Sequence, residues 1–281
     1  RGRKGLVMLF KGLPTLLCAV LAAVFGAEGE EFARLMLVGL ADTFVVSFAV
    51  EAAVSGVSLV NAFNTIFLYL FTALASGGAV VVSQYLGRKD NDRASESVSQ
   101  LLMISTVFSM VMMALVLALN KVLLRALFGS VEPAVMEACE TYLRISAYSY
   151  PALAVYNAGA AMYRSVGKTS VTMYISIIAN IINVVGNCIG VFLLHAGVAG
   201  VAWPSLIARA FSAVAITMLC FRDRFGLCYR WRWILRWNGA LQRSMLAIAI
   251  PNGLESGIFQ FVNVALSRML AMFGTYQIAA N

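Results

Sequence analysis

One carboxylate stands alone in an apolar part of the N-terminal region. Asp42 lies in LVGLADTFVVSF, residues 37–48, and no basic side chain lies within seven residues of it on either side. An acid in the middle of a membrane helix costs about 2.5–3.5 kcal/mol on insertion scales, and it usually faces a cavity that serves ions, protons or substrate. Asp42 is therefore the first candidate for a functional site; the alternative is a protonated acid that only bonds a neighbouring helix.

Three asparagines share one helix face in NIINVVGN, residues 180–187. Asn180, Asn183 and Asn187 are spaced i, i+3 and i+7, which places their side chains on the same side of a helix. Such amides could join helices, at about 0.6 kcal/mol for each hydrogen bond. Their oxygens could instead bind a hard cation such as Na⁺. The residues alone leave both interpretations open, and the presence of Asp42 favours an ion-binding site.

Two further ionisable residues lie inside apolar segments. Glu255 follows Pro251 by one helical turn in AIPNGLESGIFQF, and a broken membrane helix is tolerated where it lines protein or a cavity. Arg209 lies near the middle of the apolar run 198–220, where it could snorkel or pair with an acid. Together with Asn180, these two residues are additional candidates for a cavity.

The chain lacks the motifs of a catalytic or metal centre. HExxH, GxSxG and P-loop patterns are absent, and the five cysteines show no paired spacing. His195 is the single histidine, which argues against a zinc site. We therefore expect no enzyme and no cofactor, and no metal beyond Na⁺ at Asp42, which leaves transport as the default function.

The composition is that of a membrane protein. Hydrophobic residues make up 61% of the 281 residues, charged residues make up 12%, and the mean hydropathy is +0.84, whereas soluble domains carry about 25% charged residues. Runs of 36, 24 and 40 residues at 52–87, 97–120 and 169–208 contain no charge, and a helix needs about 20 apolar residues to cross the hydrocarbon. The sequence predicts an all-α polytopic membrane protein.

Seven helices are expected from the charge-free runs and their flanks. They cover residues 33–50, 54–86, 97–124, 136–164, 170–194, 198–220 and 242–281. Residues 12–27 are 16 charge-free residues that include Pro14, and whether they form an extra membrane segment stays open.

The loops carry an uneven charge. Three alternate loops hold eleven Lys and Arg residues, whereas the opposite side holds Lys121 and Arg125. Cytoplasmic loops are rich in Lys and Arg, so the basic loops are predicted to be cytoplasmic in a multi-pass protein of the cell membrane. The segment YRWRWILRW, residues 229–237, could bind nucleic acid, but an interfacial helix is favoured, and no nucleic-acid partner is expected.

Five motifs in order resemble the multidrug and toxic compound extrusion (MATE) family. They are ADTFVVSFAVEAAVSGVSL, VSQYLGRKDNDRA, YRSVGKTS, the pair NIINVVGN and GVAGVAWPSLIAR, and the pair AIPNGLESGIFQF and FGTYQIAAN. The resemblance runs from about residue 34 to the end of the sequence. It implies two lobes of six helices each, of which this chain would contain the N-lobe and a seventh helix.

Domain boundaries follow from that resemblance. Residues 1–32 are an N-terminal extension, 33–221 the N-lobe, 222–241 a basic cytoplasmic linker, and 242–281 the first helix of a truncated C-lobe. The resemblance also implies export of amphipathic or cationic small molecules driven by H⁺ or Na⁺, by a protein that is monomeric at full length.

The resemblance assigns an ion-coupling group as well. It implies that Asp42 is the coupling acid and that Asn183, Asn187 and Ser205 join it. Some members of the family have an acid at the position of Asn187. The lower negative charge favours proton coupling here over tight Na⁺ binding.

An internal repeat suggests that the first helix is short. FAVEAAVSG at 48–56 aligns with FGTYQIAAN at an offset of 225, whereas Arg34 pairs with Arg243 at an offset of 209. The first helix therefore lacks about 16 residues relative to the seventh, and the family's first-helix proline is not found in register. Two lobes of six helices imply a parallel repeat, and we expect the chain to be an incomplete product or a fragment.

Two other functions remain open at this stage. A lipid-linked oligosaccharide flippase shares the broader fold, but it predicts a more basic cavity than Arg209, Arg268 and Arg144 could line. The chain could also be a non-transporting remnant that acts as a membrane interaction or structural protein.

Overall fold

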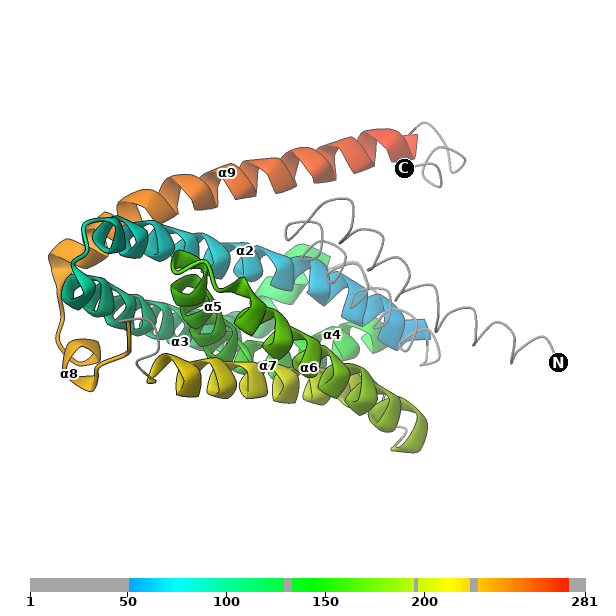
Figure 1. The fold of residues 1–281 in the computed structure, drawn as a ribbon. Coiled ribbons are helices and arrows are strands. Elements are labelled where there is room, and N and C mark those ends of the chain that lie inside the picture. The colour runs from blue at the N-terminus through cyan, green and yellow to red at the C-terminus, as the bar shows by residue number, and fades with distance from the viewer. Residues whose placement is uncertain (1–50, 129–132, 195–196, 223–226, 273–281) are drawn as a thin grey trace.

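A bundle of long helices makes up the described part of the protein (Figure 1). The computed structural model describes residues 51–128, 133–194, 197–222 and 227–272, and within them every regular element is helical. Asp42, the segment 12–27 and the expected helix 33–50 lie outside the described residues. The elements are α2 (Glu51–Gly87), α3 (Asn91–Phe128), α4 (Pro133–Tyr148), α5 (Tyr150–Ser165), α6 (Thr169–Cys188), the π-helix η1 (Ile189–Leu193), α7 (Ala199–Cys220), α8 (Trp231–Ile234) and α9 (Gly239–Met272).

Four segments of the described chain are long and apolar enough to cross a membrane. They are Phe63–Gly87, Asn91–Arg125, Thr169–Val191 and Ala199–Cys220. Their outward faces expose large apolar side chains such as Ile66, Val122, Ile181 and Met218, as suits helices whose surroundings are lipid. The prediction of an all-helical membrane protein is confirmed.

The single helix expected at 136–164 is wrong, because the structure divides it into α4 and α5 at Ser149. Pro151 has no N–H group to continue the hydrogen-bond ladder. The Ser149 N–H instead donates to the Ser146 carbonyl oxygen at 3.0 Å, and the Ser149 hydroxyl donates to the same oxygen at 2.6 Å. The break therefore leaves a serine hydroxyl, 1% exposed, in the interior of the bundle.

The helix expected at 170–194 also changes form before its end. The α-helical part stops at Cys188 and continues as the π-helix η1. In η1, Gly190 lies against the backbone of Gly200 at the start of α7, so that a Cβ atom at Gly190 would collide with the Gly200 carbonyl oxygen. The two segments can approach this closely only because both residues are glycine.

The core forms two apolar layers along the bundle. One layer joins the first half of α2 to α4 and to the end of α3, around Phe67, Phe71, Leu143 and Tyr150. The other joins the second half of α2 to the start of α3, to α5, and to the end of α7, around Leu101, Met162 and Ile216. Buried polar residues lie along α3, from Ser95 to Ser109, at the α4–α5 break, at Ser146 and Ser149, and on α6, at Asn183 and Asn187.

The segment 227–238, here called the connector, folds back onto α3 at the bundle end where α8 lies (Figure 1). Gln100 is 1% exposed, and its amide nitrogen donates to the carbonyl oxygens of Trp233 and Arg236. Its amide oxygen accepts the Asn238 N–H at 3.2 Å and the Gln242 side chain at 3.0 Å. All four hydrogen-bonding positions of this amide are used, so Gln100 fastens the connector and α9 to α3. The interfacial helix expected at 229–237 is reduced to α8.

Replacing Gln100 by Leu should loosen the connector. The substitution leaves two backbone carbonyl groups of the segment without a partner, at a cost of about 1–3 kcal/mol. We expect faster amide hydrogen exchange across 227–238 and a lower melting temperature. Gln84→Leu, an exposed position near the end of α2, is the matched control. Unchanged exchange in Gln100→Leu would show that the connector is held by other contacts.

Replacing Gly190 by Ala should push η1 away from α7. The added methyl group overlaps a backbone oxygen that no side-chain motion can relieve, and overpacking of this kind typically costs about 1–3 kcal/mol. A lower midpoint of thermal unfolding in detergent is expected. Gly257→Ala is the control, since a Cβ atom there meets nothing within 4 Å. Equal midpoints for the two variants would contradict the close approach.

Candidate functional site

The candidate site lies where α6 crosses α7. The two helices pack side by side and run in opposite directions, with Asn183 beside Ser205 and Gly186 beside Pro204. A Cβ atom at Gly186 would lie 2.6 Å from Cβ of Pro204, so the proline ring fits against bare backbone. This close crossing brings the polar side chains of the two helices within hydrogen-bonding distance.

A chain of hydrogen bonds joins three of the four residues predicted to form the ion-coupling group. The Asn187 amide nitrogen donates to Asn183 Oδ1 at 3.0 Å, and the Asn183 amide nitrogen donates to Ser205 Oγ at 2.9 Å. Ser205 Oγ donates to the Val201 carbonyl oxygen at 3.1 Å. Asn187 is 0% exposed and Asn183 is 8% exposed. Asn183, Asn187 and Ser205 thus lie together, and Asp42 lies outside the described residues.

The cluster is rich in neutral oxygen atoms. Amide, hydroxyl and backbone carbonyl oxygens are ligands that hard cations accept. Pro204 also removes the N–H that would bond the Gly200 carbonyl group. No group of three or more His, Cys, Asp or Glu side chains that could hold a metal ion occurs in the described residues. The three side chains joined by the hydrogen bonds, Asn183, Asn187 and Ser205, are all neutral.

A second polar cluster surrounds the break between α4 and α5. Arg209 Nη1 donates to Ser149 Oγ at 2.6 Å. The Tyr150 hydroxyl donates to Asn64 Oδ1 at 2.7 Å. The Asn64 amide nitrogen is buried and has no hydrogen-bond partner. The expected pairing of Arg209 with an acid is not found among the described residues, whose ion pairs are Arg93–Asp90 and Arg230–Asp92.

A related contact lies one turn earlier on α2. The Tyr142 hydroxyl donates to Asn61 Oδ1 at 3.0 Å, so two tyrosine–asparagine bonds tie α2 to α4 and α5. Sequence reasoning missed Asn64, Ser149 and Tyr150 as polar partners. A proline inside an expected helix was the signal for Ser149, but nothing local indicated the other two.

The remaining predicted residues lie apart from both clusters. Asn180 is half-buried on α6, about two turns before Asn187. Glu255 is exposed on α9, which packs mainly against α2 and α3. Glu255 is thus not brought to the α6–α7 crossing in the described part of the chain.

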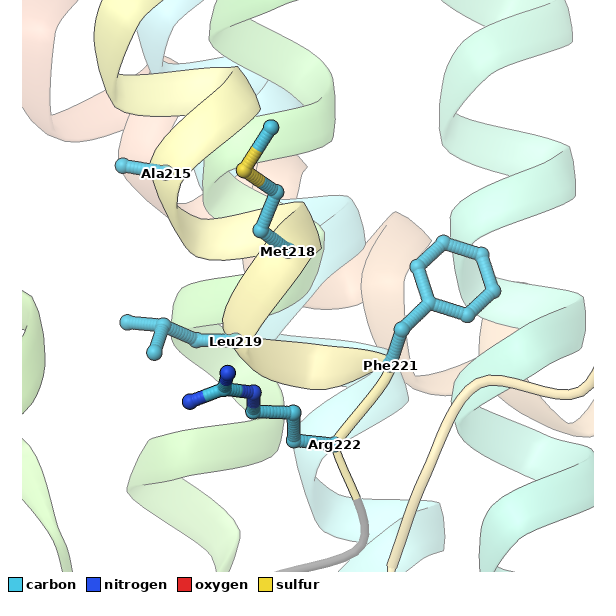
Figure 2. Close-up of a pocket in the computed structure, with 5 residues that line it drawn as sticks. All are labelled: Ala215, Met218, Leu219, Phe221 and Arg222. Carbon is cyan, nitrogen blue, oxygen red and sulfur yellow. The ribbon is translucent and has the colours of Figure 1, made fainter.

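A hollow of about 610 Å³ lies at the C-terminal end of α7 (Figure 2). Ala215, Met218, Leu219, Phe221 and Arg222 line it; the first three lie on the last turns of α7, and Phe221 and Arg222 follow its end. Ala215, the lining residue nearest to Ser205 along α7, is ten residues beyond it, a distance of about 15 Å along a helix. The hollow is therefore separate from the candidate ion site.

Comparison with known proteins finds one family model and related transport proteins. The family model MatE matches residues 31–189, more than half of the chain. The uncharacterized transporter YisQ of Bacillus subtilis is 26% identical over 248 residues, covering 87% of this chain and 54% of YisQ. The multidrug export protein MepA of Staphylococcus haemolyticus is 22% identical over 274 residues, covering 97% of this chain and 57% of MepA. The chain spans about half the length of these curated relatives.

Solved structures share the fold. A crystal structure of MATE in complex with MaL6 superposes with a TM-score of 0.81 at 20% identity, covering 88% of this chain and 54% of that chain. A crystal structure of MATE in the bent conformation gives 0.79 at 19% identity, covering 97% of this chain and 60% of that chain. With a family model that matches more than half of its length and this shared arrangement of helices, the chain belongs to the MatE family of membrane proteins.

Proposed function

We propose that this chain supplies the N-lobe of a proton-coupled exporter of amphipathic or cationic small molecules, with Asp42 as the coupling acid. The observation that carries the proposal is the buried chain from Asn187 through Asn183 to Ser205. These three residues are the partners that the family resemblance gives to Asp42. The names of MepA, an export protein, and YisQ, a transporter, support the same direction.

Proton coupling fits the chemistry of the cluster better than Na⁺ coupling does. Asn183 already donates to Ser205, and Ser205 donates to the Val201 carbonyl oxygen, while the three bonded side chains include no carboxylate. Binding a cation there would require these bonds to rearrange for neutral ligands only. A single acid can instead alternate between two partners: a proton makes Asp42 neutral, and its loss leaves a carboxylate that attracts a cationic substrate.

Proton and substrate flow are coupled because the two ligands exclude each other at Asp42. When the proton occupies Asp42, the substrate loses its counter-charge and is released. When the proton leaves, the substrate can bind again. Inward proton flow then drives outward substrate flow. The polar α6–α7 crossing supplies neutral hydrogen-bonding partners, which limit the cost of keeping an acid in the membrane.

The proposed location is the cell membrane, with the connector on the cytoplasmic side. Trp231, Leu235 and Trp237 are exposed, as are Arg232 and Arg236. Exposed tryptophans and arginines beside membrane spans suit the headgroup layer, and Arg-rich loops favour the cytoplasm.

The flippase alternative receives less support. Of the three arginines that could line a basic cavity, Arg144 is exposed, and the side chain of Arg268 lies outside those described. Of the two arginines whose side chains the structure describes, only Arg209 bonds inside the bundle. One cation is a poor match for the two phosphates of a lipid-linked pyrophosphate.

Replacing Asp42 by Asn should abolish export. The amide is permanently neutral and cannot exchange a proton, so efflux of a cationic dye such as ethidium should fall to background in cells that express the protein, with membrane insertion unchanged. Asp42→Glu should keep part of the efflux. Glu137→Gln, an exposed acid on α4, is the matched control. Efflux by Asp42→Asn equal to that of the wild type would sink the proposal, and the absence of efflux from the wild type would favour a non-transporting remnant.

Replacing Asn187 by Asp should create Na⁺ binding that the native protein lacks. The carboxylate adds a charged ligand beside the oxygens of Asn183 and Ser205. At a Na⁺ concentration 100 times the dissociation constant, the stability gained would be about 2.7 kcal/mol. The measurement is the melting temperature in NaCl against choline chloride. Asn180→Asp is the control, and a Na⁺-specific rise in the wild type would contradict proton coupling.

A further inference from the structure

A positive charge lies near the middle of a helix that is long and apolar enough to cross a membrane, and it has no carboxylate partner in the described chain. Arg209 is near the centre of α7, which spans Ala199–Cys220. Charged residues in spanning segments are rare, and they usually face a cavity or pair with an opposite charge. Here the guanidinium bonds the neutral hydroxyl of Ser149. We propose that Arg209 and Asn64 form a subsite that binds the carboxylate of an amphipathic substrate, an inference that rests on the proposed export function.

The cluster contains more hydrogen-bond donors than acceptors, so a further acceptor could bind to it. Ser149 Oγ accepts from Arg209 and gives its own proton to the Ser146 carbonyl oxygen. Asn64 Oδ1 accepts from the Tyr150 hydroxyl. The oxygen atom of each of these side chains therefore already accepts one hydrogen bond. Arg209, by contrast, carries five N–H donors, of which Ser149 takes one.

Asn64 gives an independent observation of the same kind. The residue is 8% exposed, and its amide nitrogen is buried without a hydrogen-bond partner. A buried donor left unpaired costs about as much as a lost hydrogen bond, so such groups are uncommon unless a ligand or water completes them. The cluster thus holds surplus donors on two helices, α2 and α7, on either side of the α4–α5 break.

The chemistry that completes this cluster is an anion with planar oxygens. A guanidinium binds a carboxylate through two parallel N–H···O bonds. Aromatic side chains lie beside the cluster: Phe67 stacks on Tyr150 at a centroid distance of 4.8 Å, and the ring centroid of Phe71 lies 6.0 Å from that of Tyr150. An aromatic compound that carries a carboxylate matches both features, whereas a purely cationic compound leaves Arg209 unpaired.

The test compares two fluorescent probes that differ only in this group. The methyl ester of a rhodamine is cationic, and the corresponding free acid adds one carboxylate to the same ring system. Binding of each dye to the protein in phosphatidylcholine nanodiscs is measured by fluorescence anisotropy. We expect Arg209→Gln to weaken binding of the free acid about tenfold or more, as is usual when one partner of a desolvated charge pair is removed, and to leave the ester almost unchanged.

Three further variants complete the experiment: a conservative replacement, a control and a second test. Arg209→Lys keeps the charge but loses the two-pronged geometry and should restore part of the free-acid binding. Arg222→Gln removes an exposed arginine just past the end of α7 and should leave both dyes unchanged. Asn64→Leu removes the second donor without touching the charge and should weaken the free acid selectively. It also serves as the test if Arg209→Gln fails to fold.

The outcomes separate the inference from the proposed function. Equal effects of Arg209→Gln or Asn64→Leu on the two dyes would overturn the subsite. Wild-type protein that binds the ester but not the free acid would overturn it too, while leaving the export proposal intact. Wild-type protein that binds neither dye would contradict the export proposal itself. A fold defect in Arg209→Gln that is repaired by adding Asp42→Asn would show that Arg209 pairs with that acid, which also overturns the subsite.

Discussion

Polar groups at membrane depth have to be satisfied within the protein, because lipid offers them no hydrogen bonds. In this chain the constraint acts mainly through α7. Ser205 faces α6 and receives a bond from Asn183, and one turn later Arg209 reaches Ser149 at the α4–α5 break. One helix thus joins both polar clusters, and a tilt of α7 would change the hydrogen bonds of both at once.

Prolines determine where these clusters can form. Pro151 interrupts the ladder and leaves the Ser149 hydroxyl inside the bundle, and Pro204 packs on Gly186 next to Ser205. In each case a weakened stretch of backbone lies beside a side chain that bonds another helix. The regular helices carry the apolar core, and each of these two prolines lies close to a serine hydroxyl that bonds another helix.

The sequence predicted the features that depend on composition and local spacing. Apolar runs located the long helices, and the spacing of Asn183 and Asn187 placed them on one face of a helix, where the structure joins them by a hydrogen bond. Pro151 was a local signal for the division at Ser149, whereas the π-helix at Gly190 lies against Gly200 on another segment, a contact that no local pattern encodes. The partner of Arg209 is 60 residues away, so the sequence left that residue's environment open. Gln100 was not singled out, because its four bonds all involve the connector or α9.

The connector decides which parts of the molecule can move together. Gln100 ties 233–242 to α3, and Asn238 adds a bond to Glu96 at 2.9 Å. The first half of α9 then packs along α2. The contact persists as far as Gly253, where an added Cβ atom would lie 3.4 Å from Cβ of Ala73. Beyond that point α9 leaves the bundle (Figure 1). Pro251 lies just before this divergence, where its missing N–H weakens the ladder. If export involves rearrangement of α9 relative to the bundle, the bend should therefore occur near Pro251 rather than in the connector, which is fixed at both of its ends.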